Sequence, residues 1–163
     1  MRTMSLGLAV VTSTLFLMSS EAQATPEAGF DFSQTAATIT IDTISSATPN
    51  VLRTVTIVCP AAGHAVATAN ALFQFDVNNP AFPGTIAYSL TIGSTSFQLN
   101  HQHNIFGSYV DDFHVFPSGI QRIVRCKRGQ SLTYRFLATR GTNVSNVTAR
   151  QPSLVVVFYR DRL

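Results

Sequence analysis

The sequence has no tryptophan, only two cysteines and few charged residues, which make up 12% of the chain. Soluble domains usually contain about twice that fraction of charge. Intrinsic disorder is nevertheless disfavoured, because 45% of the residues are hydrophobic and the net charge is only +3. The low charge indicates either a surface rich in Thr, Ser, Asn and Gln or a surface that contacts other subunits.

The short motifs that mark common catalytic sites are also missing. The sequence contains no G-x-S-x-G turn, no H-E-x-x-H motif, no P-loop and no Gly-rich dinucleotide turn. Asp111 and Asp112 are adjacent, so on a strand their side chains point to opposite faces and do not form a glycosidase pair. These absences favour a non-enzymatic protein, and no cofactor is predicted.

No apolar run reaches the length of about 20 residues that a membrane-spanning helix needs. The longest run, Leu6 to Met18, follows a basic start and precedes a small-residue stretch that ends Ala22-Gln23-Ala24. This order is typical of a secretory signal peptide with its cleavage site. We therefore predict that residues 1–24 are a signal peptide, that residues 25–163 form a single domain, and that the protein is secreted or periplasmic without a transmembrane segment.

The two cysteines, Cys59 and Cys126, both lie in the predicted mature chain. An even number of cysteines in an exported protein predicts a disulfide. The bond would close a loop of roughly 68 residues and stabilise the fold by about 4 kcal/mol. The reactive C-x-x-C spacing is absent, so the predicted role is structural.

Alternation of apolar and polar residues dominates the mature chain and predicts roughly eight to ten short strands. The clearest examples are Leu52 to Cys59, His64 to Asp76, Thr85 to Ile92 and Leu132 to Phe136. Gly93-Ser94 predicts a hairpin to Ser96–Leu99, and Pro117-Ser118-Gly119 predicts a turn. Ile105 to Phe116 is expected to form either one strand or two strands interrupted near Gly107. The fold class is therefore all-β: a two-sheet antiparallel β-sandwich, jelly-roll-like, with one disulfide.

The positive charge is concentrated in the last quarter of the chain. Residues 25–121 contain one base and six acids, whereas residues 122–163 contain nine bases and one acid. One interpretation is compensation between neighbouring acidic and basic strands. The other is a basic surface for an anionic ligand, a polysaccharide or a membrane surface, whereas nucleic acid is not expected. The candidate ligand-binding residues are Arg122, Arg125, Lys127, Arg128 and Arg135.

The last predicted strand, Leu154 to Tyr159, is apolar on both faces. A strand in a two-layer sandwich packs only one face on the core, so the other face needs separate cover. A loop or another subunit would supply that cover, because exposed apolar patches usually mark contact surfaces. Val155, Val157 and Tyr159 are therefore candidate residues of an oligomer interface.

Three histidines are candidate metal ligands. His101 and His103 share one strand face, and His114 follows after a distance that a hairpin would close. Imidazole with nearby carboxylate suits zinc or copper. Surface histidines in a polar loop are the alternative. Asn143 and Asn146 also begin two glycosylation sequons, which matter only in a eukaryotic host.

Three stretches resemble the globular jelly-roll heads of the complement-component and tumour-necrosis-factor superfamily. Val58 to Gly63 is similar to that family's Cys-Pro-x-x-Gly turn, Lys127 to Leu132 to its approach to a late strand, and Leu154 to Tyr159 to its hydrophobic last strand. Gln130 stands where the family has an acid, and no collagen-like stalk is present. The resemblance implies a ten-stranded jelly roll that trimerises and binds ligands without catalysis.

Three functional hypotheses follow. The first is a secreted, non-enzymatic β-sandwich that acts as a binding or structural module and self-associates. The second is an extracellular carbohydrate-binding module that uses loops near Tyr109 and Phe113. The third is a metal-dependent extracellular enzyme that uses His101, His103 and His114.

Overall fold

The fold is described from a computed structural model of the chain. The structure describes residues 30–34, 36–45, 47–78, 84–98, 102–107, 114–141 and 143–161, without the side chains of residues 30, 32, 102–107 and 114. The predicted signal peptide, residues 1–24, lies outside the described residues. Within the described ranges every regular element is a strand, and no helix suitable for crossing a membrane occurs.

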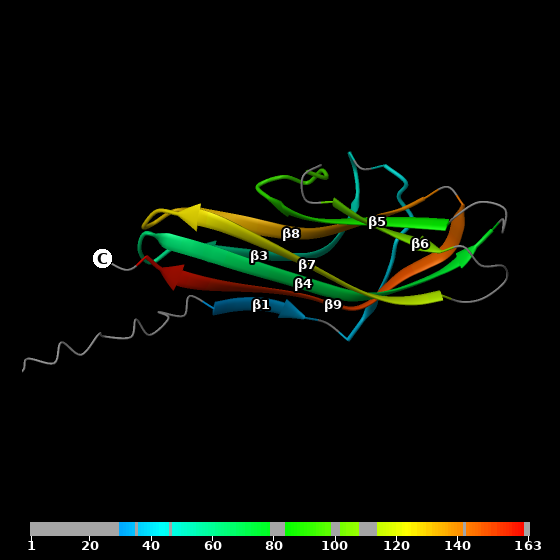
Figure 1. The fold of residues 1–163 in the computed structure, drawn as a ribbon, viewed down its shortest axis with the longest axis horizontal. Helices are drawn as coiled ribbons and strands as arrows, with labels where there is room; N and C mark the ends of the chain where they lie inside the picture. Colours follow the sequence, from blue (N-terminus) through cyan, green and yellow to red (C-terminus); the bar gives the residue numbers. More distant parts are fainter. Residues whose placement is uncertain are drawn as a thin grey trace, which may run out of the picture.

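The described residues form nine strands, all antiparallel to their neighbours (Figure 1). Their bounds are β1 Phe30–Gln34, β2 Thr38–Thr40, β3 Asn50–Val58, β4 Gly63–Val77, β5 Gly84–Ile92, β6 Gln102–Gly107, β7 His114–Cys126, β8 Ser131–Arg140 and β9 Val144–Arg160. The prediction of an all-β, antiparallel, two-sheet protein is confirmed.

The strands divide into two sheets, which Figure 1 shows stacked one above the other. One sheet has the order β1-β9-β4-β7, and β2 continues β1 along the same edge of β9. The other has the order β3-β8-β5-β6. The first of these is called the β9 sheet below, and the second the β8 sheet.

The pairing follows a nested pattern. Strands β1 and β2 pair with β9, β3 pairs with β8, β4 pairs with β7, and β5 pairs with β6. The chain is therefore one long folded-over hairpin that is wrapped into two sheets, which is the jelly-roll topology. The predicted jelly-roll-like fold is confirmed, with nine strands in the described ranges.

The core lies between the two sheets and is built from large rings facing small side chains. On β4, alternate residues from Ala65 to Ala71 point inward and are buried. Phe73 continues that row and contacts the rings of Tyr88 and Phe136, with centroid distances of 5.6 and 6.4 Å. The alanines leave room for the opposing rings, because facing layers pack best when large and small residues interleave. The predicted strand from His64 to Asp76, which contains these alanines, is confirmed as β4.

Two local predictions are wrong. Residues 93–98 form bends rather than the second strand of a hairpin, and β5 pairs with β6 instead. Pro117-Ser118-Gly119 does not turn, because these residues lie within β7 and pair with β4. Strand β7 lies at the edge of its sheet, where a proline removes no ladder hydrogen bond.

Strand β9 is longer than predicted, because its pairing with β4 continues past two β-bulges. The register against β4 shifts between Asn70 and Leu72 and again between Gln74 and Asp76. Gln151 and Asn146 have φ values of 47° and 50° at these points. Each shift leaves one extra residue on β9, which defines a β-bulge. The predicted last strand, Leu154 to Tyr159, is therefore the second half of one strand that begins at Val144.

Candidate functional site

The outward side of the β9 sheet carries an apolar surface. Val156 and Phe158 point into the core and are fully buried, so the alternating residues between and beside them point outward. Val157 is in register with Val66, and Val66 is in register with Ile123, so the apolar row crosses β9, β4 and β7. We call this surface the outer apolar face, and it consists of Val66, Ile123, Val155, Val157 and Tyr159.

The outer apolar face has measurable exposure. Ile123 is 60% exposed and Tyr159 is 48% exposed, while Val66, Val155 and Val157 are half-buried. The prediction that the last strand is apolar on both faces is therefore reproduced in three dimensions. The role of Val155, Val157 and Tyr159 in an oligomer stays a prediction.

The outward side of the β8 sheet differs. Leu137, Ser89 and Thr91 point away from the core by strand alternation, yet each is completely buried. Residues 93–98 and the segment between β2 and β3 lie over this side, above β5 in Figure 1. The two segments meet where the Ser96 hydroxyl donates to the Ala47 carbonyl oxygen at 2.8 Å. We call residues 41–49 and 93–98 the covering segments.

Two of the predicted ligand-binding arginines hold a covering segment in place. Arg122 shares its direction with Ile120 and Cys126, which point inward, and it donates to the Leu90 carbonyl at 3.0 Å and to the Gln98 side chain. Arg135 lies on the opposite side of the β8 sheet and donates to the Ser94 carbonyl at 3.4 Å. Burial lowers the pKa of Arg122. Arg122 is two residues from both Ile120 and Val124, so on a strand all three side chains share one face. This spacing was the sequence signal that Arg122 points inward.

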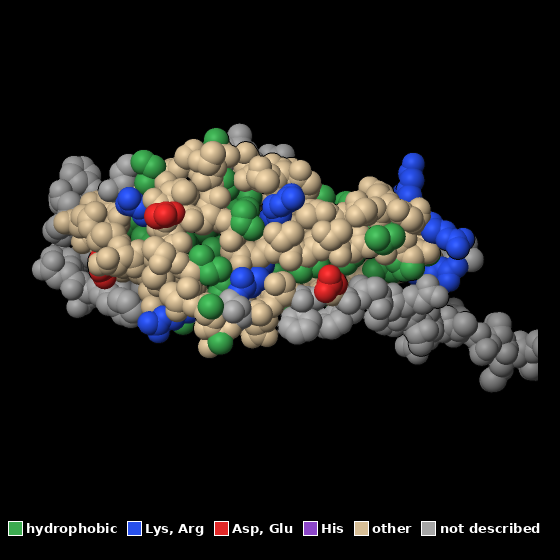
Figure 2. All heavy atoms as spheres, turned by 180° about the vertical axis from the view of Figure 1, so that it is seen from behind, with side chains coloured by type: hydrophobic (Ala, Val, Ile, Leu, Met, Phe, Trp, Pro, Cys, Tyr) green, Lys and Arg blue, Asp and Glu red, His purple; other side chains and the backbone are tan. Residues whose placement is uncertain are grey.

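The remaining predicted basic residues lie together at one end of the sandwich. Arg125 precedes the last residue of β7, Lys127 and Arg128 lie in the turn to β8, and Arg160 ends β9; all four are exposed. Figure 2 shows Lys and Arg side chains gathered at this end of the molecule. We call Arg125, Lys127, Arg128 and Arg160 the cationic tip. Arg160 was missed by sequence reasoning, because only the register Gly63↔Arg160 and Gly63↔Cys126 brings it there.

The cationic tip contains a small ion-pair network. Asp161 accepts from the Arg125 guanidinium at 3.2 Å and contacts His64 Nδ1 at 3.0 Å. Arg125 is 77% exposed, so this pair adds little to stability. Asp161 is the only acid in the described ion pairs at this end, so positive charge predominates.

The predicted disulfide between Cys59 and Cys126 is confirmed and lies directly beneath the cationic tip. The Gly129 amide donates to the Cys59 carbonyl at 2.8 Å, and the Cys59 amide donates to the Gln130 carbonyl at 2.9 Å. Gly129 has a φ of 76°, a conformation that favours glycine. The turn that carries Lys127 and Arg128 is thus joined to the end of β3 by one covalent bond and two hydrogen bonds.

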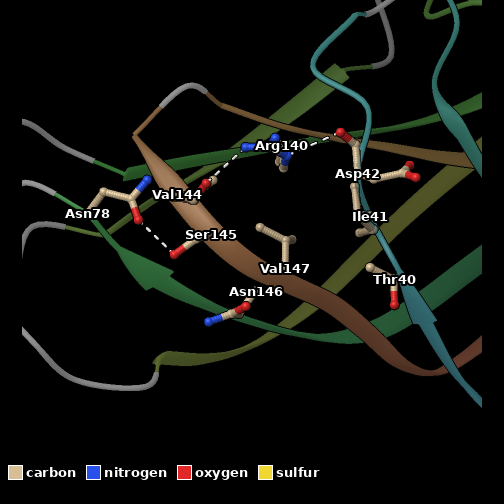
Figure 3. A pocket seen from close by; sticks show the side chains of 9 residues that line it. All are labelled: Thr40, Ile41, Asp42, Asn78, Arg140, Val144, Ser145, Asn146 and Val147. Carbon is tan, nitrogen blue, oxygen red and sulfur yellow. Dashed lines mark hydrogen bonds between the residues drawn. The ribbon is translucent and has the colours of Figure 1, made fainter.

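A pocket of about 270 Å³ lies at the opposite end (Figure 3). Buried Ile41, Val144 and Val147 form its apolar part. The polar lining residues are Thr40, Asp42, Asn78, Arg140, Ser145 and Asn146.

The polar groups of the pocket mainly bind one another and the backbone. Arg140 donates to the carbonyls of Asp42 and Val144 at 3.1 and 3.0 Å, and Ser145 donates to Asn78 at 2.6 Å. The hydrogen bond from Asn50 holds the pKa of Asp42 below its usual value, and the charge of Arg140 acts in the same direction. These contacts connect the start of β9 to β8 and to the segment after β2, so the role of the polar pocket residues is structural.

Several predicted site residues cannot be placed. His101, Tyr109 and Phe113 lie outside the described residues, as do the side chains of His103 and His114. In the described part of the chain, no group of three His, Cys, Asp or Glu side chains is arranged to hold a metal. The metal site and the carbohydrate-binding loops stay predictions.

No family model and no curated protein matches this chain. Among solved structures, it is similar to infectious bursal disease virus, Gx strain (8% identity, TM-score 0.46), over 82% of this chain and 33% of the viral chain. It is also similar to Eiger TNF from S. frugiperda (10% identity, TM-score 0.42, 85% and 96% covered) and to the sugar-binding EclA C-terminal domain (6%, 0.38, 85% and 86%).

The chain therefore spans about a third of the viral chain that it matches. At these identities and TM-scores the similarities carry no functional argument. The jelly-roll assignment rests on the strand order of this chain. The trimer implied by the resemblance to the complement-component and tumour-necrosis-factor superfamily stays a prediction.

Proposed function

We propose that the protein is an exported, non-catalytic β-sandwich module that self-associates through its outer apolar face. The observation that carries this proposal is the row of Val157, Val66 and Ile123 across three adjacent strands, with Ile123 60% exposed. Contiguous exposed apolar surface is typical of contact sites, because its removal from water stabilises an assembly.

The charge distribution on the β9 sheet supports the same surface. The outward residues of the apolar row carry no charge, and on β7 the next outward residue after Ile123 is Arg125, near the end of the strand. Interface centres are depleted of charge and surrounded by polar residues. Tyr159, which is in register with His64, lies between the apolar row and that charged end.

Export is supported by the predicted signal peptide and by the Cys59–Cys126 disulfide, because such bonds persist in oxidising compartments. N-terminal sequencing of the protein recovered from the producing cells tests this part separately. A chain that begins at Thr25 is expected, and retention of residues 1–24 would contradict export.

Self-association is tested by size-exclusion chromatography with light scattering over a range of protein concentrations. Ile123→Lys places a charge on the outer apolar face at an exposed edge-strand position, so it leaves folding intact and is expected to give monomers. Val58→Lys is the matched control, because Val58 is 63% exposed on the β8 sheet. The wild-type protein and Val58→Lys are expected to form oligomers, and a wild-type monomer at every concentration would overturn the proposal.

A further inference from the structure

We propose that the cationic tip is a binding site for an acidic polysaccharide. The first observation is the placement of its charges. Gly63 on β4 is in register with Cys126 on β7 and with Arg160 on β9. The ends of β7 and β9, which carry the tip residues, therefore lie on either side of β4. Strands two positions apart are separated by about 10 Å. The four cations therefore lie together at one end of the sandwich, where strand alternation directs Arg125 and Arg160 to opposite faces of the sheet.

The second observation is the state of these charges. Asp161 is shared between Arg125 and His64. Lys127 and Arg128 are exposed, and their side chains make no ion pair with any described acid. Like charges held close together repel one another, so a polyanion that bridges them relieves this repulsion as well as gaining attraction.

The third observation is preorganisation. The Cys59–Cys126 bond, the Gly129–Cys59 hydrogen bond and the Gln130–Lys127 hydrogen bond at 3.0 Å fix the backbone beneath Lys127 and Arg128. Gly63 is also required here, since a Cβ at this position would overlap the Tyr159 carbonyl oxygen and the Phe158 ring. A rigid turn loses little entropy when a ligand binds, so the cations are presented at low conformational cost.

The ligand class follows from the composition of the turn. Residues 127–131 are Lys, Arg, Gly, Gln and Ser, so the turn has no apolar side chain to insert into a lipid interface. Gln130 Oε1 accepts from the Lys127 amide at 3.0 Å, which leaves the Gln130 Nε2 group and the Ser131 hydroxyl to bind the hydroxyls and carboxylates of a sugar. A linear sugar polymer with repeated carboxylate or sulfate groups matches both features. The inference shares the export prediction with the proposed function but not self-association.

The test uses the purified, disulfide-linked protein and a heparin dodecasaccharide or polygalacturonate as probe, with binding measured by calorimetry at about 50 and 200 mM salt. Lys127→Glu/Arg128→Glu is expected to weaken binding about tenfold or more and to reduce the salt dependence. Arg150→Glu is the matched control, because Arg150 is exposed on β9 beyond the bulge at Gln151. It is expected to change affinity less than about twofold.

Three outcomes would overturn the inference. They are no binding of either probe at the lower salt, equal weakening by the tip and control variants, and tighter binding to anionic vesicles or single-stranded DNA than to the sugars. Unchanged thermal unfolding of the tip variant confirms that its loss is local. Repeating the measurement on Ile123→Lys separates this inference from self-association, because retained binding by a monomer supports the tip alone.

Discussion

The two outward sides of the sandwich differ in how they are covered. On the β8 sheet, Leu137 points away from the core and is nevertheless completely buried. On the β9 sheet, Ile123 and Tyr159 point outward and are about half exposed. Both sheets thus have apolar residues on two sides, but the described part of the chain places covering segments over only one of them.

This difference is the basis of the proposed self-association through the outer apolar face. The covering segments are held by named contacts, including Ser96 to Ala47 and Arg135 to Ser94. On the β9 sheet, β1 pairs with β9 beside the outer apolar face, and Ile123 and Tyr159 stay exposed among the described residues. Cover supplied within a chain contributes to its stability, whereas exposed apolar surface is typical of contact sites.

The largest expected effect comes from truncating one outward apolar side chain of each sheet to alanine. Leu137→Ala should lower the free energy of unfolding by about 3 kcal/mol, because it leaves a cavity beneath the covering segments. Val157→Ala should cost about 1 kcal/mol in the monomer, because its side chain is only half-buried. Urea unfolding of both variants at low protein concentration measures the difference. Equal losses would show that the two sides are covered alike.

The second prediction concerns the arginine contacts of residues 93–98. Arg122→Met should cost about 1–2 kcal/mol, because it removes hydrogen bonds to Leu90 and Gln98 from a charged donor. Arg135→Met should cost less, since Arg135 contributes a single bond to Ser94 at 3.4 Å. Hydrogen exchange should speed up in residues 89–98 of both variants. Protection equal to that of the wild type would mean that the arginines do not hold this segment.

The third prediction concerns the interior between the two sheets and is tested by measuring stability at alkaline pH. Burial raises the pKa of Tyr134 to about 12 from 10, so the folded state keeps a proton that the unfolded state loses. Stability should therefore fall as the pH rises above 10, by about 1 kcal/mol between pH 10 and 11. Tyr134→Phe should remove most of this slope. Tyr88, whose pKa burial also raises, accounts for a residual. An unchanged slope in Tyr134→Phe would contradict the assignment.

The smallest expected effect is at the base of a covering segment. The hydrogen bond from Asn50 lowers the pKa of Asp42 below 3.8, and Asn50 also accepts from the Thr43 hydroxyl at 2.8 Å. This contribution is present above the unfolded pKa and is lost as the pH falls through the lower folded value. Asp42→Asn should flatten the acid limb of the unfolding curve slightly. A steeper acid limb in this variant would be inconsistent with the lowered pKa.

The sequence predicted the features that arise from local alternation. Cys59 and Cys126, the two-sided last strand and the β character of the Ala-rich segment all follow from residue type and period. Leu52 shows the limit of such reasoning. Alternation alone placed it opposite Val55, but the bulge between Val51 and Arg53 turns both Leu52 and Val55 into the core.

The covering segments were not predictable for a different reason. Their contacts join residues far apart in the chain, such as Ser96 to Ala47, and such contacts leave no periodic trace in either segment. The same holds for Arg160 in the cationic tip, which reaches Cys126 only through their shared neighbour Gly63. Long-range register decides which charged residues become neighbours, and a single sequence does not contain that register.

The position of β9 has a consequence for the order in which the protein folds. This strand comes after all the other described strands in the chain, yet it lies between β1 and β4 inside its sheet. Strands β1 and β2 pair with no other described strand, so they have no ladder partner until residues 144–160 have left the ribosome. The hydrogen-bonded ladder of this sheet is therefore completed only after residues 144–160 have been synthesised, although the strands on both sides of β9 precede it in the chain.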